Sequence, residues 1–471
     1  MAGTWEPLTK APPALPNGDT FNADAMLLLP DGSILVHHAG EDLRGGVEWL
    51  RFRPSAAGSY RDGEWSAAGS MTNTRQFFAS GVRPDGKVFV IGGEYSSAAP
   101  NEDTPLGEIF DPATNQWSPL DTKPADFDWI KGDAPCCVLA DGRVLLGAIE
   151  EASSAIYDPV SGKWIPAGTA HQTVTSTKEG QAGEETWTLL RDGSVLAVET
   201  YPLQQRPLGA EKYIPSKDIW VKAGTTPAQL VDLDMHEIGP AVLLPDGRVL
   251  AIGGTGHTTF YSADASDPAK PGSWKAGQDL IDNGVLLTVN DGPACLLPSG
   301  KVLCLAGTRT AQAGENGGTE YWSLDPVFFE YDPVADSAVK TPSQIALSST
   351  WIAKLLLAPS GEVLCTAEQN QMYVYRPDGL ANDSWRPTIS NAPKDLVAGV
   401  EYPLVGTQLN GLSQAVSYGD DYTAATNFPL VRLEAQGAGA PAVYYCTTSG
   451  FGFATGAAPI AIKFTVPGKV Q

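Results

Sequence analysis

Four carboxylate residues occupy nearly equivalent positions in successive units of this 471-residue sequence: Asp133, Glu184, Glu237 and Asp291. His236 directly precedes Glu237. Sets of carboxylate oxygens bind hard cations such as Ca²⁺, Mg²⁺ or Mn²⁺, and a histidine can add a nitrogen ligand or carry a proton. Titratable groups of this kind also form general acid–base sites when a fold gathers them. These residue types therefore indicate metal-assisted or acid–base chemistry, provided that the chain brings them together.

Seven copies of one short phrase must position these residues. The phrase is an apolar run, a turn with glycine and a second apolar run, and its plainest copy is AVLLPDGRVLAIGG at 241–254. The turn glycines are spaced by 54, 56, 51, 54, 53 and 61 residues, and they are Gly32, Gly86, Gly142, Gly193, Gly247, Gly300 and Gly361. Asp-Gly between such runs is typical of a β-hairpin. Because both arms are almost wholly apolar, the hairpins must bury one another, which predicts a β-propeller.

Two further strands are expected in each unit, and EIFDPATNQWSPL at 108–120 is an example. The third strand ends in an aromatic residue and often Asp-Pro, whereas the fourth carries a tryptophan. We expect these tryptophans to wedge between neighbouring blades; they are Trp65, Trp117, Trp164, Trp220, Trp274 and Trp385. GTWEPLTKAP at 3–12 is one spare outer strand, which predicts that it helps to close the last blade. The predicted fold is all-β, with a seven-bladed propeller over residues 1–389.

Charge and composition argue against several classes of partner. The formal net charge is −23, so we expect neither nucleic acid nor an anionic membrane surface to bind. No apolar run approaches the roughly 20 residues that span a bilayer. No leader is visible in the first residues, MAGTWEPLTKAPP, so we expect a cytoplasmic protein, or a secreted one if a leader precedes this sequence. We also expect a monomer. Its six cysteines lie in strand-like segments, which predicts buried free thiols rather than a disulfide framework.

From about residue 390 the repeat stops, and residues 390–471 are typical of a small Ig-like β-sandwich. Blades with Gly-Gly after the second strand, Tyr-Asp-Pro after the third and a tryptophan in the fourth resemble kelch repeats. A kelch ring followed by a sandwich resembles the galactose oxidase and glyoxal oxidase superfamily. The segment GTQLNGLSQAVSYGDDYTAATNFPLVRL at 406–433 is similar to the C-terminal domain of that superfamily. The resemblance covers essentially the whole chain and implies the architecture more than the chemistry.

Oxidases of that superfamily use copper, a tyrosine cross-linked to a cysteine, a tyrosine–histidine pair and a C-terminal histidine. Alignment on the hairpin turns places the cross-linked tyrosine near Phe77 and its cysteine within 22–24. The tyrosine–histidine pair falls at Trp351 and Ile352, and the C-terminal histidine falls within 412–421, which contains none. Phenylalanine cannot coordinate copper or carry a phenoxyl radical. We therefore expect no copper-radical cofactor.

The resemblance also implies a site on the ring axis, built from the segments before each innermost strand and the loops after each second strand. For catalysis we expect Glu184, Glu237, His236, Asp133, Asp291 and Arg75. As ligands of Ca²⁺, Mg²⁺ or Mn²⁺ we expect Asp24, Asp133, Glu184, Glu237 and Asp291. As substrate contacts we expect Phe77, Trp351, Tyr95, Tyr201, Arg309 and His257.

Three functional interpretations follow. The first is a non-copper enzyme with an acidic axial funnel, which performs hydrolysis, elimination or isomerisation on a small polar or sugar-like substrate. The second is a non-catalytic module that binds a glycan or a protein, with stacking by Trp129, Trp187, Trp322 and Trp351. The third is a galactose-oxidase-like oxidase with a rearranged site.

Overall fold

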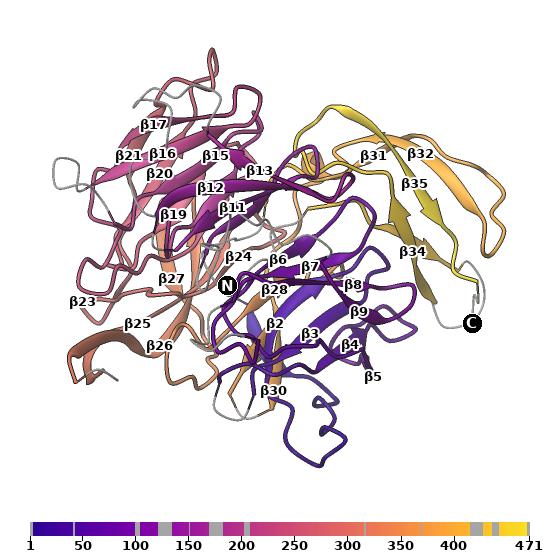
Figure 1. Cartoon of the computed structure of the whole chain (residues 1–471), viewed down its shortest axis with the longest axis horizontal. Coiled ribbons are helices and arrows are strands. Elements are labelled where there is room, and N and C mark those ends of the chain that lie inside the picture. The colour runs from indigo at the N-terminus through magenta and orange to yellow at the C-terminus, as the bar shows by residue number, and fades with distance from the viewer. Residues whose placement is uncertain are drawn as a thin grey trace.

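The computed structural model describes residues 3–40, 43–98, 104–120, 134–149, 151–168, 182–201, 208–314, 317–368, 370–414, 427–435 and 442–468. These residues form β-strands and a single short 3₁₀ helix, η1 (Asp383–Trp385). Seven four-stranded antiparallel sheets make up a β-propeller, and a five-stranded sheet follows it (Figure 1). None of the described helices is long and apolar enough to cross a membrane.

Blades 1 to 4 follow the chain, each with its strands in sequence order from the axis outward. Blade 1 consists of β2 (Ala23–Leu28), β3 (Ile34–His38), β4 (Trp49–Arg53) and β5 (Glu64–Ala67). Blade 2 consists of β6 (Ala79–Val82), β7 (Val88–Ile91), β8 (Gly107–Asp111) and β9 (Gln116–Pro119). Blade 3 consists of β10 (Cys136–Val138), β11 (Val144–Ala148), β12 (Glu151–Asp158) and β13 (Lys163–Ala167). Blade 4 consists of β14 (Trp187–Leu189), β15 (Val195–Val198), β16 (Gly209–Ile214) and β17 (Ile219–Thr225).

Blades 5 and 6 continue this order, with a small hairpin between them. Blade 5 consists of β18 (Ala241–Leu243), β19 (Val249–Ile252), β20 (Thr258–Ser262) and β21 (Ser273–Ala276). The hairpin pairs β22 (Ile281–Asp282) with β23 (Val285–Leu286). Blade 6 consists of β24 (Ala294–Leu296), β25 (Val302–Ala313), β26 (Thr319–Asp332) and β27 (Ser337–Lys340). In Figure 1 the β25–β26 hairpin projects from the ring at the lower left.

Blade 7 joins the two ends of the propeller sequence. It consists of β28 (Leu355–Leu357), β29 (Val363–Ala367), β30 (Gln371–Arg376) and, outermost, β1 (Thr4–Pro7). The predicted closure by the N-terminal strand is therefore confirmed, and β1 replaces the fourth strand. Trp385 does not belong to this blade, which corrects our assignment, because it lies in η1. Its ring contacts the turn of blade 6, where a Cβ at Gly300 would lie 2.4 Å from it.

The repeated phrase forms the inner hairpin of every blade. All seven turn glycines have positive φ, between 74° and 92°. In each turn the glycine N–H donates to the carbonyl oxygen three residues earlier, as Gly247 does to Leu244 at 2.9 Å. The innermost strands of successive blades contact one another around the axis, including β28 with β2. The apolar core therefore lies between blades; one cluster, for example, combines Phe260 of blade 5 with Phe329 of blade 6.

The fourth-strand tryptophans pair with aromatic residues of the third strand. In register, Trp117 lies opposite Phe110, Trp220 opposite Tyr213, and Trp5 opposite Tyr375. Several also reach the preceding blade, as we expected. The Trp220 indole N–H donates to Ser154 Oγ at 3.0 Å, and the Trp274 indole N–H donates to the Ala223 carbonyl oxygen at 2.9 Å. These rings therefore fill the space between the outer strands of neighbouring blades.

After blade 7, the chain forms the five-stranded sheet β31-β32-β35-β34-β33. Its strands are β31 (Thr388–Asn391), β32 (Glu401–Thr407), β33 (Val431–Glu434), β34 (Val443–Ser449) and β35 (Pro459–Thr465). The Ig-like sandwich stays a prediction, because 415–426 and 436–441 lie outside the described residues. So does its boundary at 389/390, although β31 already begins at Thr388.

The C-terminal sheet packs on the side of the propeller where the hairpin turns lie. Its Phe451 and Phe464 share one core cluster with blades 1 to 3, and Figure 1 shows the sheet beside them. At the turn of blade 1, a Cβ on Gly32 would lie 2.5 Å from the Tyr445 ring, so this glycine is required both by its φ of 74° and by the close approach. The opposite side of the ring is left for the loops that precede the innermost strands.

All six cysteines are buried and free, as the sequence predicts. Burial raises the pKa of the Cys136 and Cys304 thiols to about 12. Such thiols carry no significant thiolate at neutral pH, so these cysteines serve as small apolar residues of the core.

Candidate functional site

Three of the predicted carboxylates converge on the propeller axis. Glu184 precedes β14, Glu237 precedes β18, and Asp291 precedes β24, so three successive blades contribute one residue each. Each offers a carboxylate oxygen, and these three oxygens lie within 4.8 Å of one another. Glu237 and Asp291 are only 8% exposed, and Glu184 is half-buried. We call these three residues the carboxylate cluster.

Hydrogen bonds between blades hold the backbone of the cluster. Asp291 N–H donates to the carbonyl oxygen of Ile238 at 3.2 Å, and Thr186 Oγ1 donates to that of Gly239 at 2.8 Å. Glu184 and Asp291 adopt left-handed φ values of 56° and 49°. Such conformations cost a non-glycine residue of order 1–3 kcal/mol and persist only where the surroundings impose them. The segments that precede the innermost strands are therefore fixed in a shape that turns both side chains to one place.

His236 lies beside the cluster in the chain and has a defined tautomer. Its Nδ1 lies 3.0 Å from the carbonyl oxygen of Thr200. A carbonyl oxygen can only accept, so Nδ1 donates this hydrogen bond and Nε2 is the ring nitrogen left for another contact. The ring stacks on Tyr201 with centroids 4.0 Å apart and an interplanar angle of 11°. The His236 ring is thus held by the Thr200 carbonyl oxygen at Nδ1 and by the Tyr201 ring on its face.

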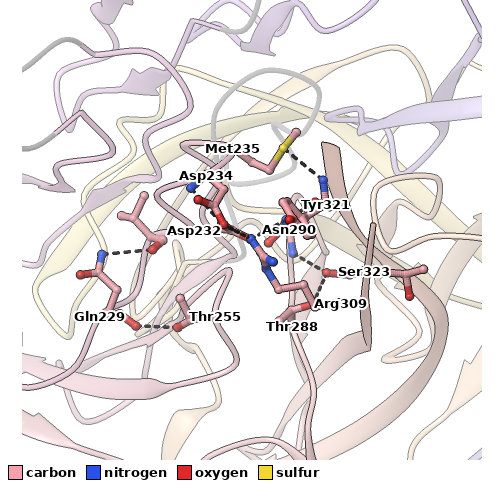
Figure 2. Close-up of polar contacts among 12 residues, drawn as sticks. Gln229, Asp232, Asp234, Met235, Thr255, Thr288, Asn290, Arg309, Tyr321 and Ser323 are labelled. Atoms are coloured by element: carbon pink, nitrogen blue, oxygen red, sulfur yellow. Dashed lines mark hydrogen bonds and ion pairs between the residues drawn. The ribbon is translucent and has the colours of Figure 1, made fainter. Parts of the chain in front are cut away.

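Arg309 is held by aspartates that the sequence analysis did not single out. Its Nε and Nη2 donate to the two carboxylate oxygens of Asp232 at 2.9 and 3.0 Å, and Nη2 also donates to Asp234 at 2.6 Å (Figure 2). The guanidinium lies 3.7 Å from the Tyr321 ring centroid. Burial by itself would raise the pKa of Asp232, but its hydrogen bonds, above all with Arg309, hold that pKa below its usual value. Two of the three guanidinium nitrogens, Nε and Nη2, are therefore engaged with aspartates.

A row of four aromatic side chains borders the cluster. Its members come from blades 2, 6 and 7, with neighbouring ring centroids 6.2 to 6.4 Å apart; in order they are Tyr95, Phe77, Trp351 and Trp322. Thr350 Oγ1 donates to the carbonyl oxygen of Asn290 at 2.5 Å. Trp351 and Asp291 follow these two residues in the chain, so a hydrogen bond joins the backbone segment of one member of the row to that of one member of the cluster.

A pocket of about 310 Å³ opens beside Trp351. Blades 7, 1 and 2 line it, with Asn22, Asp24, Gln76, Trp351 and Glu368 among its polar and aromatic residues. The positions that align with copper ligands in the resembling superfamily, 22–24, 351 and 352, are all in its lining. The positions that the hairpin turns align with copper ligands therefore lie together in the structure. None of the side chains that line the pocket is a cysteine, tyrosine or histidine.

Asp24 lies in the pocket wall with its carboxylate already engaged. Gln76 Nε2 donates to Oδ2 at 2.7 Å, and Lys354 Nζ lies 3.8 Å from Oδ1. Burial alone would raise the pKa of Asp24. The charge of Lys354, the nearby His37 ring (Nδ1 3.6 Å from Oδ2) and the hydrogen bond from Gln76 outweigh burial, and they lower the pKa to about 2. Among the described residues Asp24 is not part of the carboxylate cluster, so its role as a metal ligand stays only a prediction.

We expect Asp24→Asn to lose stability in a pH-dependent manner. Because the folded-state pKa is lowered to about 2 from 3.8, the ionised Asp24 stabilises the fold above pH 3.8, and this contribution disappears as the pH falls through 2. The shift corresponds to about 2 kcal/mol. Urea unfolding of both proteins at pH 5.5 should show a gap of this order that closes near pH 2. Asp383→Asn, in an exposed ion pair, serves as the control and should show almost no gap at either pH. A gap independent of pH would contradict the assignment.

The structure shows the partners or the burial of three other residues that the sequence singled out. Arg75 is 0% exposed; its Nη1 donates to the carbonyl oxygen of Gly92 at 2.7 Å and its Nη2 to Glu108 at 3.2 Å, so it braces blade 2 and no atom of it reaches a substrate. His257 Nδ1 pairs with Asp279 at 3.0 Å. Trp187 is 0% exposed, which corrects the expectation that it stacks on a sugar.

Two predicted residues cannot be placed. Asp133, expected as a ligand and as a catalytic group, and Trp129, expected to stack on sugars, lie outside the described residues. The sequence held one sign of the network that Arg309 forms with Asp232 and Asp234. Asp232 and Asp234 stand only a few positions before Glu237, in the segment VDLDMHE at 231–237.

Comparison with known proteins supports the fold. A model of the kelch motif matches residues 78–124, within blade 2 and the segment that follows it. No curated protein matches this sequence. A fungal alcohol oxidase of the AA5 family, solved in complex with copper, is similar at a TM-score of 0.57 with 13% identity, over 99% of this chain and 93% of that one. At that identity the likeness concerns the fold alone.

Two further solved structures are similar at lower scores. Streptogramin B lyase matches with a TM-score of 0.47 and 8% identity, over 80% of this chain and 99% of that one. The extracellular domain of a putative hybrid two-component system of B. thetaiotaomicron matches with a TM-score of 0.49 and 12% identity, over 83% of this chain and 45% of that one. The kelch match in blade 2 and the fold shared with the alcohol oxidase both agree with the kelch-type β-propeller described above.

Proposed function

We propose that this protein is an enzyme whose axial site holds a divalent cation on Glu184, Glu237 and Asp291 and uses His236 as its base. The observation that carries the proposal is the convergence of three carboxylate oxygens within 4.8 Å on the axis. The reaction would be a hydrolysis, elimination or isomerisation of a small polar or sugar-like substrate.

The cluster has the chemistry of a site for Ca²⁺, Mg²⁺ or Mn²⁺. Like charges this close repel, and more strongly where burial keeps water away, as it does at Glu237 and Asp291. A divalent cation between them turns this repulsion into attraction. Hard cations accept six or more oxygen ligands, so three carboxylates leave positions for water and substrate. An open coordination sphere is typical of a catalytic ion rather than a structural one.

The remaining residues suit acid–base work on a bound substrate. A bound cation would polarise a substrate oxygen and lower the pKa of bound water. His236 would accept the proton at Nε2, because its Nδ1–H is committed to the Thr200 carbonyl oxygen. The aromatic row would hold the apolar face of the substrate, and the pocket beside Trp351 would receive its polar part. Arg309 gives three hydrogen bonds from Nε and Nη2 to aspartates, so we assign it to holding the site together, and direct contact with the substrate through Nη1 stays a prediction.

Copper-radical chemistry does not fit these residues. Phe77 stands where the cross-linked tyrosine would be, and its ring offers no ligand atom and no phenolic oxygen. Trp351 and Ile352 likewise provide no oxygen or imidazole ligand in the pocket that they line. We therefore propose that this chain shares the architecture of the copper-containing alcohol oxidase without its redox chemistry.

A second candidate function is glycan binding without turnover. The aromatic row supports it, because Phe77, Trp351 and Trp322 could stack on successive sugar faces at the mouth of the pocket. The two functions differ in their dependence on metal. A binding module would retain its ligand in the presence of a chelator, whereas the proposed enzyme would lose activity.

We expect divalent cations to stabilise the wild-type protein. A ligand that binds only the folded state adds about 2.7 kcal/mol at a concentration 100 times its Kd. Thermal unfolding followed by circular dichroism should therefore show a melting temperature several degrees higher with Mn²⁺ or Ca²⁺ than with a chelator, and the shift should reverse on chelation. The absence of a shift with Ca²⁺, Mg²⁺ and Mn²⁺ would contradict the proposed cation site.

A further inference from the structure

We infer that Arg309 is a positioning residue of the cation site: the hairpin formed by β25 and β26 acts as a clamp that fixes the segments carrying Glu237 and Asp291. This inference rests on the proposed function. It goes further by assigning a role to an insertion in the propeller, and by naming the residue on which the geometry of the site depends.

Among the strands that the structure describes, such an extended hairpin occurs in blade 6 alone. Strand β25 has 12 residues and β26 has 14, whereas the second and third strands of the other blades have four to eight. The two strands remain paired out to Ala313 and Thr319, beyond the ordinary length of a blade. The ring itself does not need this extension, so its residues are available for another task.

The clamp acts first on the loop that ends at Glu237. Asp232 N–H donates to the carbonyl oxygen of Glu237 at 2.8 Å, and His236 N–H donates to that of Asp232 at 2.6 Å. Asp232 therefore closes the loop whose far end carries both functional side chains. The Asp232 carboxylate is 5% exposed and receives the two-pronged hydrogen bond of Arg309 (Figure 2). Fixing Asp232 fixes the backbone of Glu237.

The same hairpin acts on the segment that carries Asp291. Ser323 Oγ accepts the backbone N–H of Asn290 at 3.1 Å, and the Tyr321 carbonyl oxygen accepts its side-chain amide at 3.0 Å. That amide also reaches Asp232 at 3.5 Å. The residue before Asp291 is thus attached both to the hairpin and to the aspartate that Arg309 holds, as Figure 2 shows. Two of the three carboxylates of the cluster therefore depend on one network.

The shape of the arginine side chain matters here as well as its charge. A guanidinium can donate two parallel hydrogen bonds to one carboxylate and can stack on an aromatic face, and Arg309 does both. A lysine would keep the charge but lose the fork and the stacking. Charge alone has the opposite effect on the site, because a nearby positive group repels a bound cation. Removing that charge would tighten cation binding if Arg309 acted only through its field.

Loss of positioning should weaken cation binding, whereas loss of the positive charge should strengthen it, so variants of Arg309 in the full-length protein distinguish the two effects. Mn²⁺ affinity is measured by titration for the wild type, Arg309→Lys, Arg309→Met and the matched control Arg248→Met. Arg248 is 31% exposed, pairs with Asp246 and lies over Phe260, much as Arg309 is 32% exposed, pairs with Asp232 and lies over Tyr321. Arg248 belongs to the hairpin turn of blade 5, on the opposite side of the ring. Melting temperatures of the metal-free proteins record stability.

We expect both Arg309 variants to bind Mn²⁺ about 10–100-fold more weakly than the wild type, as is usual when a group that orients a metal ligand is removed. Arg248→Met should bind like the wild type, even if its melting temperature falls as far as that of Arg309→Lys. Wild-type affinity in both Arg309 variants, or tighter binding in Arg309→Met with no change in Arg309→Lys, would overturn the inference alone. A wild type that binds no Mn²⁺ would overturn the proposed function, and the inference with it.

Discussion

Replacing Glu237 by glutamine should lower the affinity for Mn²⁺ by at least about 100-fold, which corresponds to about 2.7 kcal/mol. Glu237 is 8% exposed, and one of its carboxylate oxygens lies within 4.8 Å of a carboxylate oxygen of Glu184 and of Asp291. Glutamine has nearly the same size, so the change removes one of three negative charges with little change in packing. Charge count is a main determinant of affinity in oxygen-ligand sites. Glu184→Gln and Asp291→Asn should each have an effect of the same order.

The comparison for this prediction is Asp282→Asn. Asp282 forms an ion pair with Lys340 at 2.8 Å on the small hairpin before blade 6, so its replacement removes the same charge from the protein without touching the cluster. It should leave Mn²⁺ affinity unchanged. Isothermal titration calorimetry on metal-free proteins gives the affinities, and thermal unfolding shows that each variant is folded. Equal losses in Glu237→Gln and Asp282→Asn would mean that net charge, rather than a site, governs the binding.

Replacing Trp5 by alanine should lower the free energy of unfolding by about 3–5 kcal/mol, the usual cost of truncating a buried tryptophan. Trp5 lies on β1, the strand that closes blade 7, and is 8% exposed. Its ring centroid lies 4.6 Å from that of Phe328 in blade 6 and 4.9 Å from that of Tyr375 in blade 7. This side chain therefore joins the closing strand to two blades, and we expect its truncation to weaken the closure of the ring.

Two other variants make this prediction specific to ring closure. Trp5→Phe should cost clearly less, because it keeps the ring contacts and removes an indole N–H that has no acceptor among the described residues. Trp164→Ala removes the equivalent fourth-strand tryptophan of blade 3, where the chain is continuous, and Trp164 is only half-buried. Urea unfolding followed by far-UV circular dichroism measures all three. A cost for Trp5→Ala no larger than that for Trp164→Ala would contradict the closing role of β1.

The repeat made the fold predictable because each unit carries the same local chemistry. Every Asp-Gly or Ser-Gly turn required positive φ at its glycine, and all seven glycines adopt it. The spare strand at 3–12 predicted closure by the N-terminus, but the identity of the replaced strand depended on pairing that only the structure shows. Trp385 was misplaced because the repeat phrase was followed one strand too far, past the point where β1 takes the outer position.

The candidate site was predictable only in part. Glu184, Glu237 and Asp291 hold equivalent places in the repeat, so one frame placed all three. This alignment of the repeats on their turn glycines does not predict the direction in which each side chain points. Arg75 turns back into blade 2 toward Glu108, and Trp187 turns into the core, where its indole N–H meets Glu185 at 2.8 Å. Contacts across blades, such as Arg309 with Asp232, join residues 77 positions apart and have no local signature.

The most direct test of the account is a crystal structure of the wild-type protein soaked in Mn²⁺ and recorded where manganese scatters anomalously. We expect one anomalous peak on the propeller axis, within coordination distance of carboxylate oxygens of Glu184, Glu237 and Asp291. If the three carboxylates are well ordered in the soaked crystal and no anomalous peak lies beside them, the proposed cation site is wrong.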